Sequence, residues 1–157
     1  MNKELVELVL NRAFENFEER TIDFDVDWSY LKLTSINDII YSKIKLINTY
    51  HENNSVELIE KELSQVIIYS IIGIFQISFD NFYAVKLDKE VIMTDFVSKK
   101  NEIIDAIIRI DNSSLVQYTL QNLTSEIEFL KEIENEKVKI EDYYEIVNIA
   151  LILIVSQ

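Results

Sequence analysis

The sequence predicts an all-α fold, and three observations support this prediction. The chain of 157 residues contains no proline and one glycine, so few residues interrupt a helix. Apolar residues recur at helical spacing along most of the chain. Hydrophobic residues make up 48% of the sequence and charged residues 27%, which is typical of a folded domain with one core. We therefore expect a single helical domain over residues 1–157.

The first element is a helix over residues 2–19, because its apolar side chains return every three or four positions. Residues 21–28 then alternate acidic with apolar side chains. We expect an extended loop there, with Phe24, Val26 and Trp28 packed inward, because no partner strand is nearby.

A helical hairpin is predicted for residues 35–79, with a polar turn at 51–54. Ser35 is expected to cap its first helix and Ser55 its second, because serine is a preferred N-cap residue. The second helix is apolar nearly all round from residue 66 to residue 79. Such a helix is either central and buried or the seam of a homodimer.

Gly73 lies inside that apolar helix, where it costs about 1 kcal/mol relative to alanine. We expect close approach of another helix to compensate for this cost. The apolar run is also shorter than the roughly 20 residues that a membrane span needs. With no cysteine and no signal peptide in the sequence, we expect a soluble cytoplasmic protein without a membrane partner.

Four more helices are predicted in the second half of the chain. Two shorter ones are expected at residues 81–93 and 95–110. Ser113 and Ser114 are expected to begin a third, which runs to about residue 133. After a turn at 134–137, the last helix is expected over residues 139–155.

The two halves, approximately residues 15–79 and 95–155, follow the same plan of a helix, a polar turn and an apolar helix. Aligning their first helices places Asp38 opposite Gln117 and Lys43 opposite Asn122. We interpret the chain as a diverged duplication of a helical hairpin. The alternative is that any helical bundle contains such hairpins.

Two segments carry a resemblance to a known family. The run D-F-D-V-D-W at 23–28, followed by S-I-N-D-I-I-Y-S-K at 35–43, resembles the nucleotide modification associated domain family, and Y-S-I-I-G-I-F-Q at 69–76 is similar to its ending. The resemblance covers residues 15–79 well and residues 95–155 weakly. Some members carry two tandem copies, and the family is linked to MazG-like all-α nucleoside triphosphate pyrophosphatases. The resemblance implies a MazG-like helical bundle, a nucleotide ligand, and Mg²⁺ held by acidic residues.

Four carboxylates are candidate magnesium ligands: Asp38, Glu57, Glu60 and Glu145. Glu57 and Glu60 share a helix face, so they can hold one ion if Asp38 faces them across the hairpin. A second hypothesis is a composite site, in which Asp38 from the first half joins Glu145 from the second. The candidates for substrate binding are Lys43 for a phosphate, Trp28 or Tyr69 for a base, and Asn148. The sequence assigns no catalytic residue.

Two main functions therefore remain open, beside a third alternative of a structural homo-oligomer that uses residues 66–79 as its seam. The chain is either a diverged nucleotide-pyrophosphatase-like protein that binds or hydrolyses a nucleotide with Mg²⁺, or an acidic immunity or inhibitor protein that binds a basic protein without catalysis. The net charge of −13 suits a divalent cation or a basic partner, and it argues against a general nucleic-acid binder. Release of pyrophosphate from nucleotides distinguishes the two.

Overall fold

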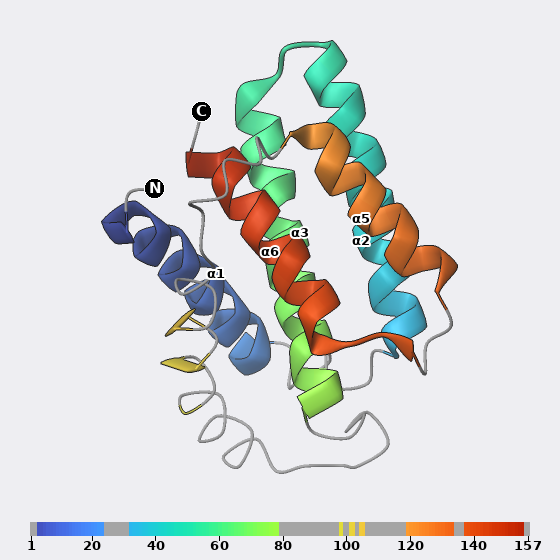
Figure 1. Cartoon of the computed structure of the whole chain (residues 1–157). Coiled ribbons are helices and arrows are strands. Elements are labelled where there is room, and N and C mark those ends of the chain that lie inside the picture. Colours follow the sequence, from blue (N-terminus) through green and yellow to red (C-terminus); the bar gives the residue numbers. More distant parts are fainter. Residues whose placement is uncertain are drawn as a thin grey trace.

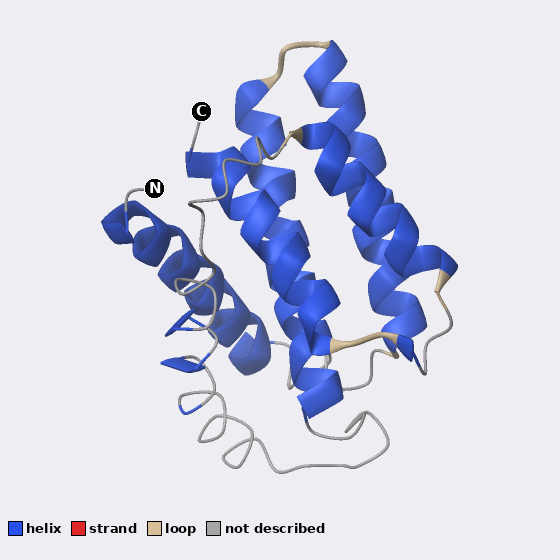
Figure 2. Ribbon diagram, viewed as in Figure 1, coloured by secondary structure: helices blue, strands red, loops and turns tan. Residues whose placement is uncertain are grey.

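The computed structural model describes residues 3–23, 32–78, 119–133 and 137–155, together with 98, 101, 102, 104 and 105. Its helices are α1 (Lys3–Asp23), α2 (Leu33–Glu52), α3 (Val56–Ser78), α5 (Leu120–Glu132) and α6 (Ile140–Val155). Figures 1 and 2 show helices and short loops, and the described residues contain no strand. The predicted all-α fold class is confirmed.

Two helical hairpins, α2–α3 and α5–α6, form a four-helix bundle (Figure 1). α3 packs most extensively against α2 and α6, and α5 covers α2 and α6. α1 lies across the side of the bundle, against α3 and α6. The predicted helices at 81–93 and 95–110 fall almost wholly outside the described residues, as do the 24–31 segment with Trp28 and the predicted start at Ser113 and Ser114.

The start of α2 differs from the prediction. Lys32, not Ser35, is the N-cap residue, with extended backbone angles (φ −74, ψ 156). Among the described residues, no side chain caps this end. The cap lies three residues earlier than predicted, Leu33 is buried in the core, and Ser35 falls in the first turn of the helix. The predicted Ser35 cap is therefore wrong.

The turn between α2 and α3 is shorter than predicted, because α2 continues through His51 to Glu52. Asn54 completes the turn in the left-handed region (φ 56), which asparagine tolerates better than most residues. The backbone N–H of Ser55 donates to the carbonyl of Tyr50 at 2.9 Å. Ser55 immediately precedes α3, at the predicted place.

The apolar part of α3 is a central helix of the core. Residues 66–68 and 70–76 are all buried within this one chain, by α2, α6 and α1. The interpretation as a central buried helix is confirmed, and this face is not left uncovered as a dimer seam would be. Gly73 meets α6 closely, because a Cβ there would lie 2.5 Å from Cζ of Tyr143. The expected close approach is thus made by a tyrosine ring.

The second hairpin has defined helix starts. Thr119 caps α5, and its hydroxyl accepts a hydrogen bond from the backbone N–H of Asn122 at 3.3 Å. α6 begins one residue from its predicted position, and the Asp142 carboxylate accepts from the backbone N–H of Lys139 at 2.8 Å. None of the helices in the described part of the chain is long and apolar enough to span a membrane.

Candidate functional site

Lys43, the predicted phosphate contact, has an internal partner. Its Nζ lies 3.0 Å from Oε2 of Glu62, and their side chains are 25% and 11% exposed. The ion pair joins α2 to α3 at the edge of the core. Sequence reasoning did not single out Glu62, although it is the last acid before the apolar part of α3. In this arrangement Lys43 is the ion-pair partner of Glu62 within the hairpin.

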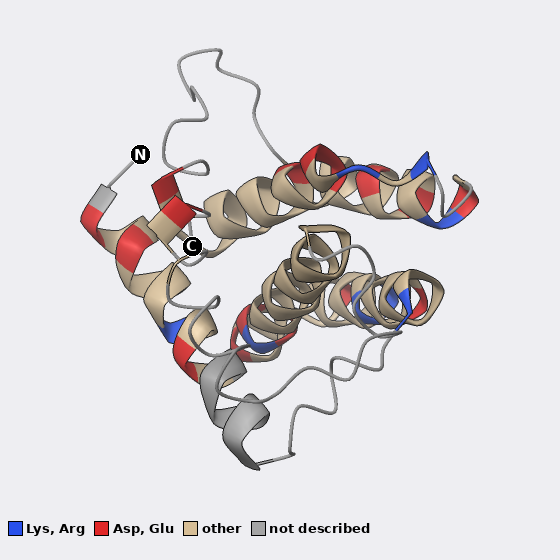
Figure 3. Cartoon of the chain, turned by 90° about the horizontal axis from the view of Figure 1, so that it is seen from below, with Lys and Arg blue, Asp and Glu red and all other residues tan. Residues whose placement is uncertain are grey.

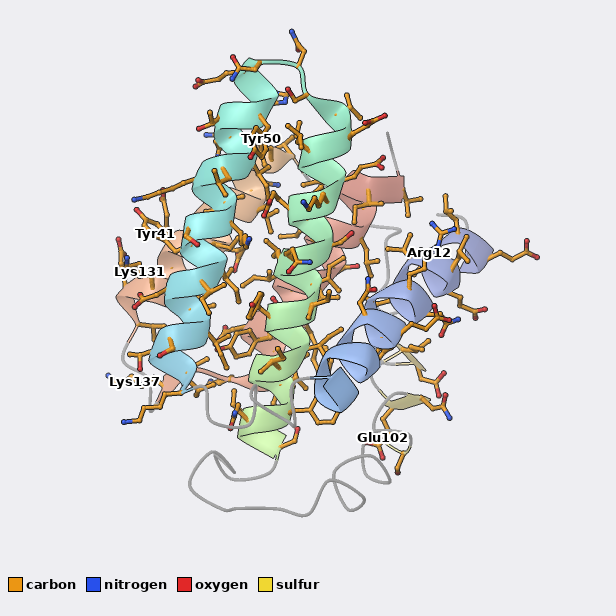
Figure 4. All side chains as sticks on the ribbon, turned by 180° about the vertical axis from the view of Figure 1, so that it is seen from behind. Arg12, Tyr41, Tyr50, Glu102, Lys131 and Lys137 are labelled. Atoms are coloured by element: carbon orange, nitrogen blue, oxygen red, sulfur yellow. The ribbon has the colours of Figure 1, made fainter. Side chains whose placement is uncertain are left out.

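Asp38 faces α5. Its Oδ1 lies 3.9 Å from Nζ of Lys131, and both side chains are largely exposed. The same ammonium group stacks over the ring of Tyr41, 4.0 Å from its centroid, and Figure 4 shows the two side chains together. Nζ of Lys45 lies 4.4 Å from the same centroid. Asp38 therefore belongs to a surface contact between α2 and α5.

The geometry of the α2–α3 hairpin separates Asp38 from Glu57 and Glu60, the other two metal candidates of the first half. The Lys43–Glu62 pair sets the register of α2 against α3. Asp38 lies five residues before Lys43 on α2, and Glu57 lies five residues before Glu62 on α3. Because α2 and α3 are antiparallel, the two offsets add, and Asp38 lies about 15 Å from Glu57 along the helix axis. Asp38 lies about 10 Å from Glu60 along the same axis. The structure does not bring Asp38 beside Glu57 and Glu60.

Glu145 lies half-buried on α6, near Glu126 of α5. Burial, and then the negative charge of Glu126, raise the pKa of Glu145. Asp38 lies against Lys131 of α5 and Glu145 lies near Glu126 of α5, so each of the two composite-site acids has a different neighbour on that helix.

The remaining substrate candidates lie at the core. Tyr69 is half-buried and packs against it. Asn148 is fully buried, and within the described part of the chain neither Nδ2 nor Oδ1 has a hydrogen-bond partner. Such an amide destabilises a fold by about 1–3 kcal/mol. Asn148 is therefore placed in the interior of the bundle rather than at its surface.

A buried hydrogen bond that the sequence did not predict joins the two hairpins. The Tyr143 hydroxyl of α6 donates to Oδ1 of Asn37 in α2 at 2.6 Å. Burial and the nearby Asp142 raise the pKa of Tyr143, and the bond to Asn37 opposes that rise. The available signal was an asparagine between two buried isoleucines, Ile36 and Ile40, on the inward face of α2. This bond orients Tyr143 against Gly73.

Two of the four metal candidates share a cleft of about 290 Å³ between α1 and α3. We call it the charged cleft, and its polar lining is formed by Arg12, Asn16, Glu57, Glu60, Lys61 and Ser64. The apolar floor includes Ala13 and Ile67. Figure 4 labels Arg12 on α1. The cleft thus contains two carboxylates, two cations, an amide and a hydroxyl.

Helical periodicity on both walls builds the charged cleft. Arg12 and Asn16 are one turn apart on α1, and the four polar residues of α3 follow the spacing i, i+3, i+4, i+7. The Ser64 hydroxyl donates to the backbone carbonyl of Glu60 at 3.0 Å. All four charged side chains are exposed, so they keep their water and can exchange it for a ligand.

The charged cleft fits a metal bound together with a phosphate better than a metal alone. In the described part of the chain, no three or more histidine, aspartate or glutamate residues lie close enough to hold an ion. Mg²⁺ is usually bound by one or two carboxylates, with phosphate oxygens and waters completing its shell. Glu57 and Glu60 supply the two carboxylates, and Arg12 and Lys61 supply the charge that a phosphate needs.

Acidic residues also recur along the outer helices. Figure 3 shows them on α1 and along the α5–α6 layer. The pKa of Tyr144 is raised by burial and then by Glu102 and Glu141, which places these two acids near its ring. These acids therefore add negative charge beside Tyr144 on α6.

Comparison of the chain with family models, with curated proteins and with solved structures finds no match. The clefts and surfaces that the described residues form are therefore the basis for a function.

Proposed function

We propose that the protein binds the metal–phosphate part of a nucleotide in the charged cleft. One observation carries the proposal: Glu57 and Glu60 line the same cleft as Arg12 and Lys61. The resemblance of residues 15–79 to a nucleotide-associated family supports a nucleotide as the source of the phosphate. We also propose that the fold is a diverged MazG-like bundle built from two hairpin repeats.

Each side chain of the cleft has a role in this proposal. The two carboxylates hold Mg²⁺, which neutralises phosphate charge when bound. The planar guanidinium of Arg12 binds two phosphate oxygens at once, and Lys61 contributes a point charge. Asn16 and Ser64 offer neutral hydrogen-bonding groups beside them.

The size of the cleft limits which part of the nucleotide it takes. Pockets that enclose a whole drug-sized ligand measure about 300–1,000 Å³. The charged cleft, at about 290 Å³, lies just below that range. It therefore suits the phosphates and the metal, with the sugar and base extending beyond it.

Calorimetric titration with nucleoside triphosphates, with and without Mg²⁺, tests the proposal. Glu57→Gln combined with Glu60→Gln is expected to weaken binding at least about tenfold in the presence of Mg²⁺, because neutral amides replace both carboxylate ligands of the ion. Arg12→Gln is expected to weaken binding to a similar extent. Glu52→Gln and Lys45→Gln change exposed charges outside the cleft and serve as matched controls. Equal affinity of all variants refutes the proposal.

Hydrolysis is tested separately by pyrophosphate release from the same nucleotides. Release that requires Mg²⁺ and is lost in the double variant assigns the cleft a catalytic role. Binding without release assigns it a binding role alone.

A second candidate is association with a basic protein, favoured by the acidic residues around α6. Burial and then Glu126 raise the pKa of Glu145, and burial and then Glu102 and Glu141 raise that of Tyr144, so negative charge gathers around these two residues. A cationic partner is attracted to this negative charge, and its association is expected to weaken strongly as the salt concentration rises. An NMR titration with a lysine-rich peptide tests this candidate. Salt-sensitive shifts on α6 support it, whereas shifts confined to other helices reject it.

A further inference from the structure

A second and larger cavity lies at the end of the bundle where α2 ends and α5 begins. Its volume is about 550 Å³, within the range of small-molecule sites. Asn48 and His51 of α2 and Gln121 and Thr124 of α5 form its polar side. In Figure 1 this is the upper part of the bundle, where α5 begins below the turn between α2 and α3.

The lining of this cavity is electrically neutral apart from His51. Branched aliphatic side chains, among them Ile59 and Leu63 of α3 and Leu153 of α6, form its apolar side. None of the described residues that line it is an aspartate, glutamate, lysine or arginine. In a chain with a net charge of −13, such a lining selects for an uncharged ligand.

The hydrogen bonds at the cavity wall define what it can recognise. The Asn48 amide nitrogen donates to the Ile44 carbonyl at 2.9 Å and to the Thr124 hydroxyl at 3.1 Å. The Thr124 hydroxyl donates in turn to the carbonyl of Leu120 at 2.8 Å. Both amide hydrogens of Asn48 are thus engaged, and this network fixes which way its side chain is turned. Asn48 offers Oδ1 as an acceptor, and the amide of Gln121 can donate.

We propose that this neutral cavity binds an uncharged planar heterocycle that carries an N–H beside a carbonyl, the arrangement found in uracil. The ring N–H donates to Oδ1 of Asn48, and the ring carbonyl accepts from Gln121. The flat faces of the ring lie against the aliphatic side chains of the cavity. A carboxylate or phosphate on the ring disfavours entry, because no lysine or arginine among the described lining residues compensates its charge.

This site is distinct from the charged cleft. Ile59 and Leu63, which line the neutral cavity, lie one turn apart on one face of α3. Glu57, Glu60 and Lys61 of the charged cleft lie on another face of the same helix. The inference therefore does not depend on metal–phosphate binding, and a probe without a phosphate tests it alone.

The test is a two-dimensional NMR titration of the whole chain with uracil, which contains no phosphate. A fragment of this size is expected to bind with on the order of millimolar affinity, with shifts at the residues of the neutral cavity. The matched probe 1,3-dimethyluracil keeps the ring but lacks both N–H donors, and it is expected to bind about tenfold more weakly. Orotate, a uracil with an added carboxylate, is also expected to bind more weakly. Equal binding of all three probes, or no shifts at the cavity, overturns the proposal.

Two variants separate recognition from a general effect on folding. Gln121→Trp places a large side chain at the exposed rim and is expected to abolish the shifts. Phe129→Trp enlarges an exposed residue farther along α5 and is the matched control. Asn48→Leu removes the acceptor and is expected to weaken uracil binding about tenfold while leaving that of 1,3-dimethyluracil unchanged. If Asn48→Leu weakens both probes equally in a folded protein, the proposed hydrogen bond is refuted.

Discussion

Gly73 is the position at which a single methyl group tests how α3 packs against α6. A Cβ at this position would lie 2.5 Å from Cζ of Tyr143 and 2.7 Å from its Cε1 and Cε2. The ring cannot simply swing away, because Tyr143 is fully buried and its hydroxyl is bonded to Asn37 at 2.6 Å. Gly73→Ala therefore forces the ring to shift and strains or breaks that bond.

The expected free-energy change follows from three contributions. Replacing an interior helical glycine with alanine stabilises the helix by about 1 kcal/mol. Overpacking a core costs roughly 1–3 kcal/mol. Leaving the buried Asn37 amide without its partner costs about 1–3 kcal/mol more. With mid-range costs, Gly73→Ala is expected to destabilise the protein by about 3 kcal/mol.

Urea unfolding followed by circular dichroism measures this change, and a double-mutant cycle isolates its cause. Tyr143→Leu keeps an apolar side chain but removes the ring atoms that the new methyl group would meet. In that background Gly73→Ala is expected to be neutral or to stabilise the protein by up to about 1 kcal/mol. If Gly73→Ala stabilises the protein that retains Tyr143, the described packing of α3 against α6 is refuted.

Three further predictions concern buried polar groups. Asn148→Leu is expected to raise the free energy of unfolding by about 1–2 kcal/mol, because it removes an amide without hydrogen-bond partners in the described part of the chain; a loss of stability in urea unfolding contradicts this. Lys43→Met is expected to cost about 2 kcal/mol by leaving the mostly buried Glu62 carboxylate without its cation, and adding Glu62→Leu is expected to recover most of that loss. If the double variant is less stable than the single one, the pair has another role. Glu145→Gln is expected to raise the melting temperature at pH 7 but not at pH 4. The folded-state pKa of Glu145 is raised above its ordinary value of 4.5, so its contribution to stability is fully present below that value and is lost as the pH rises through the raised pKa. An equal gain at both pH values contradicts the assigned cause, burial beside Glu126.

The helices that sequence reasoning located best are those whose pattern comes from burial. α6 was predicted within one residue, and the apolar part of α3 was predicted to be either a buried central helix or a dimer seam, of which the first is observed. In both helices, a long run of apolar side chains indicates burial in the core. The start of α2 was placed wrongly, because Ser35 has the right chemistry for a cap but burial of Leu33 extends the helix past it.

The candidate site was only partly predictable, because its residues come from helices whose relative register is not encoded locally. The pairing of Glu57 with Glu60 follows from helical spacing alone. Their meeting with Arg12 depends on how α1 crosses α3, which periodicity does not determine. Glu62 and Asn37 were missed for the same reason, since each is explained by a partner on another helix.

The central claim is that the charged cleft binds a metal together with a phosphate. The most direct test uses Mn²⁺, which broadens NMR signals near it, added with a nonhydrolysable nucleoside triphosphate. The account predicts that signals of Asn16 and Ser64 broaden first, and that the broadening is lost when Glu57→Gln and Glu60→Gln are combined. Broadening that instead centres on Glu126 and Glu145, or that persists unchanged in the double variant, contradicts the claim.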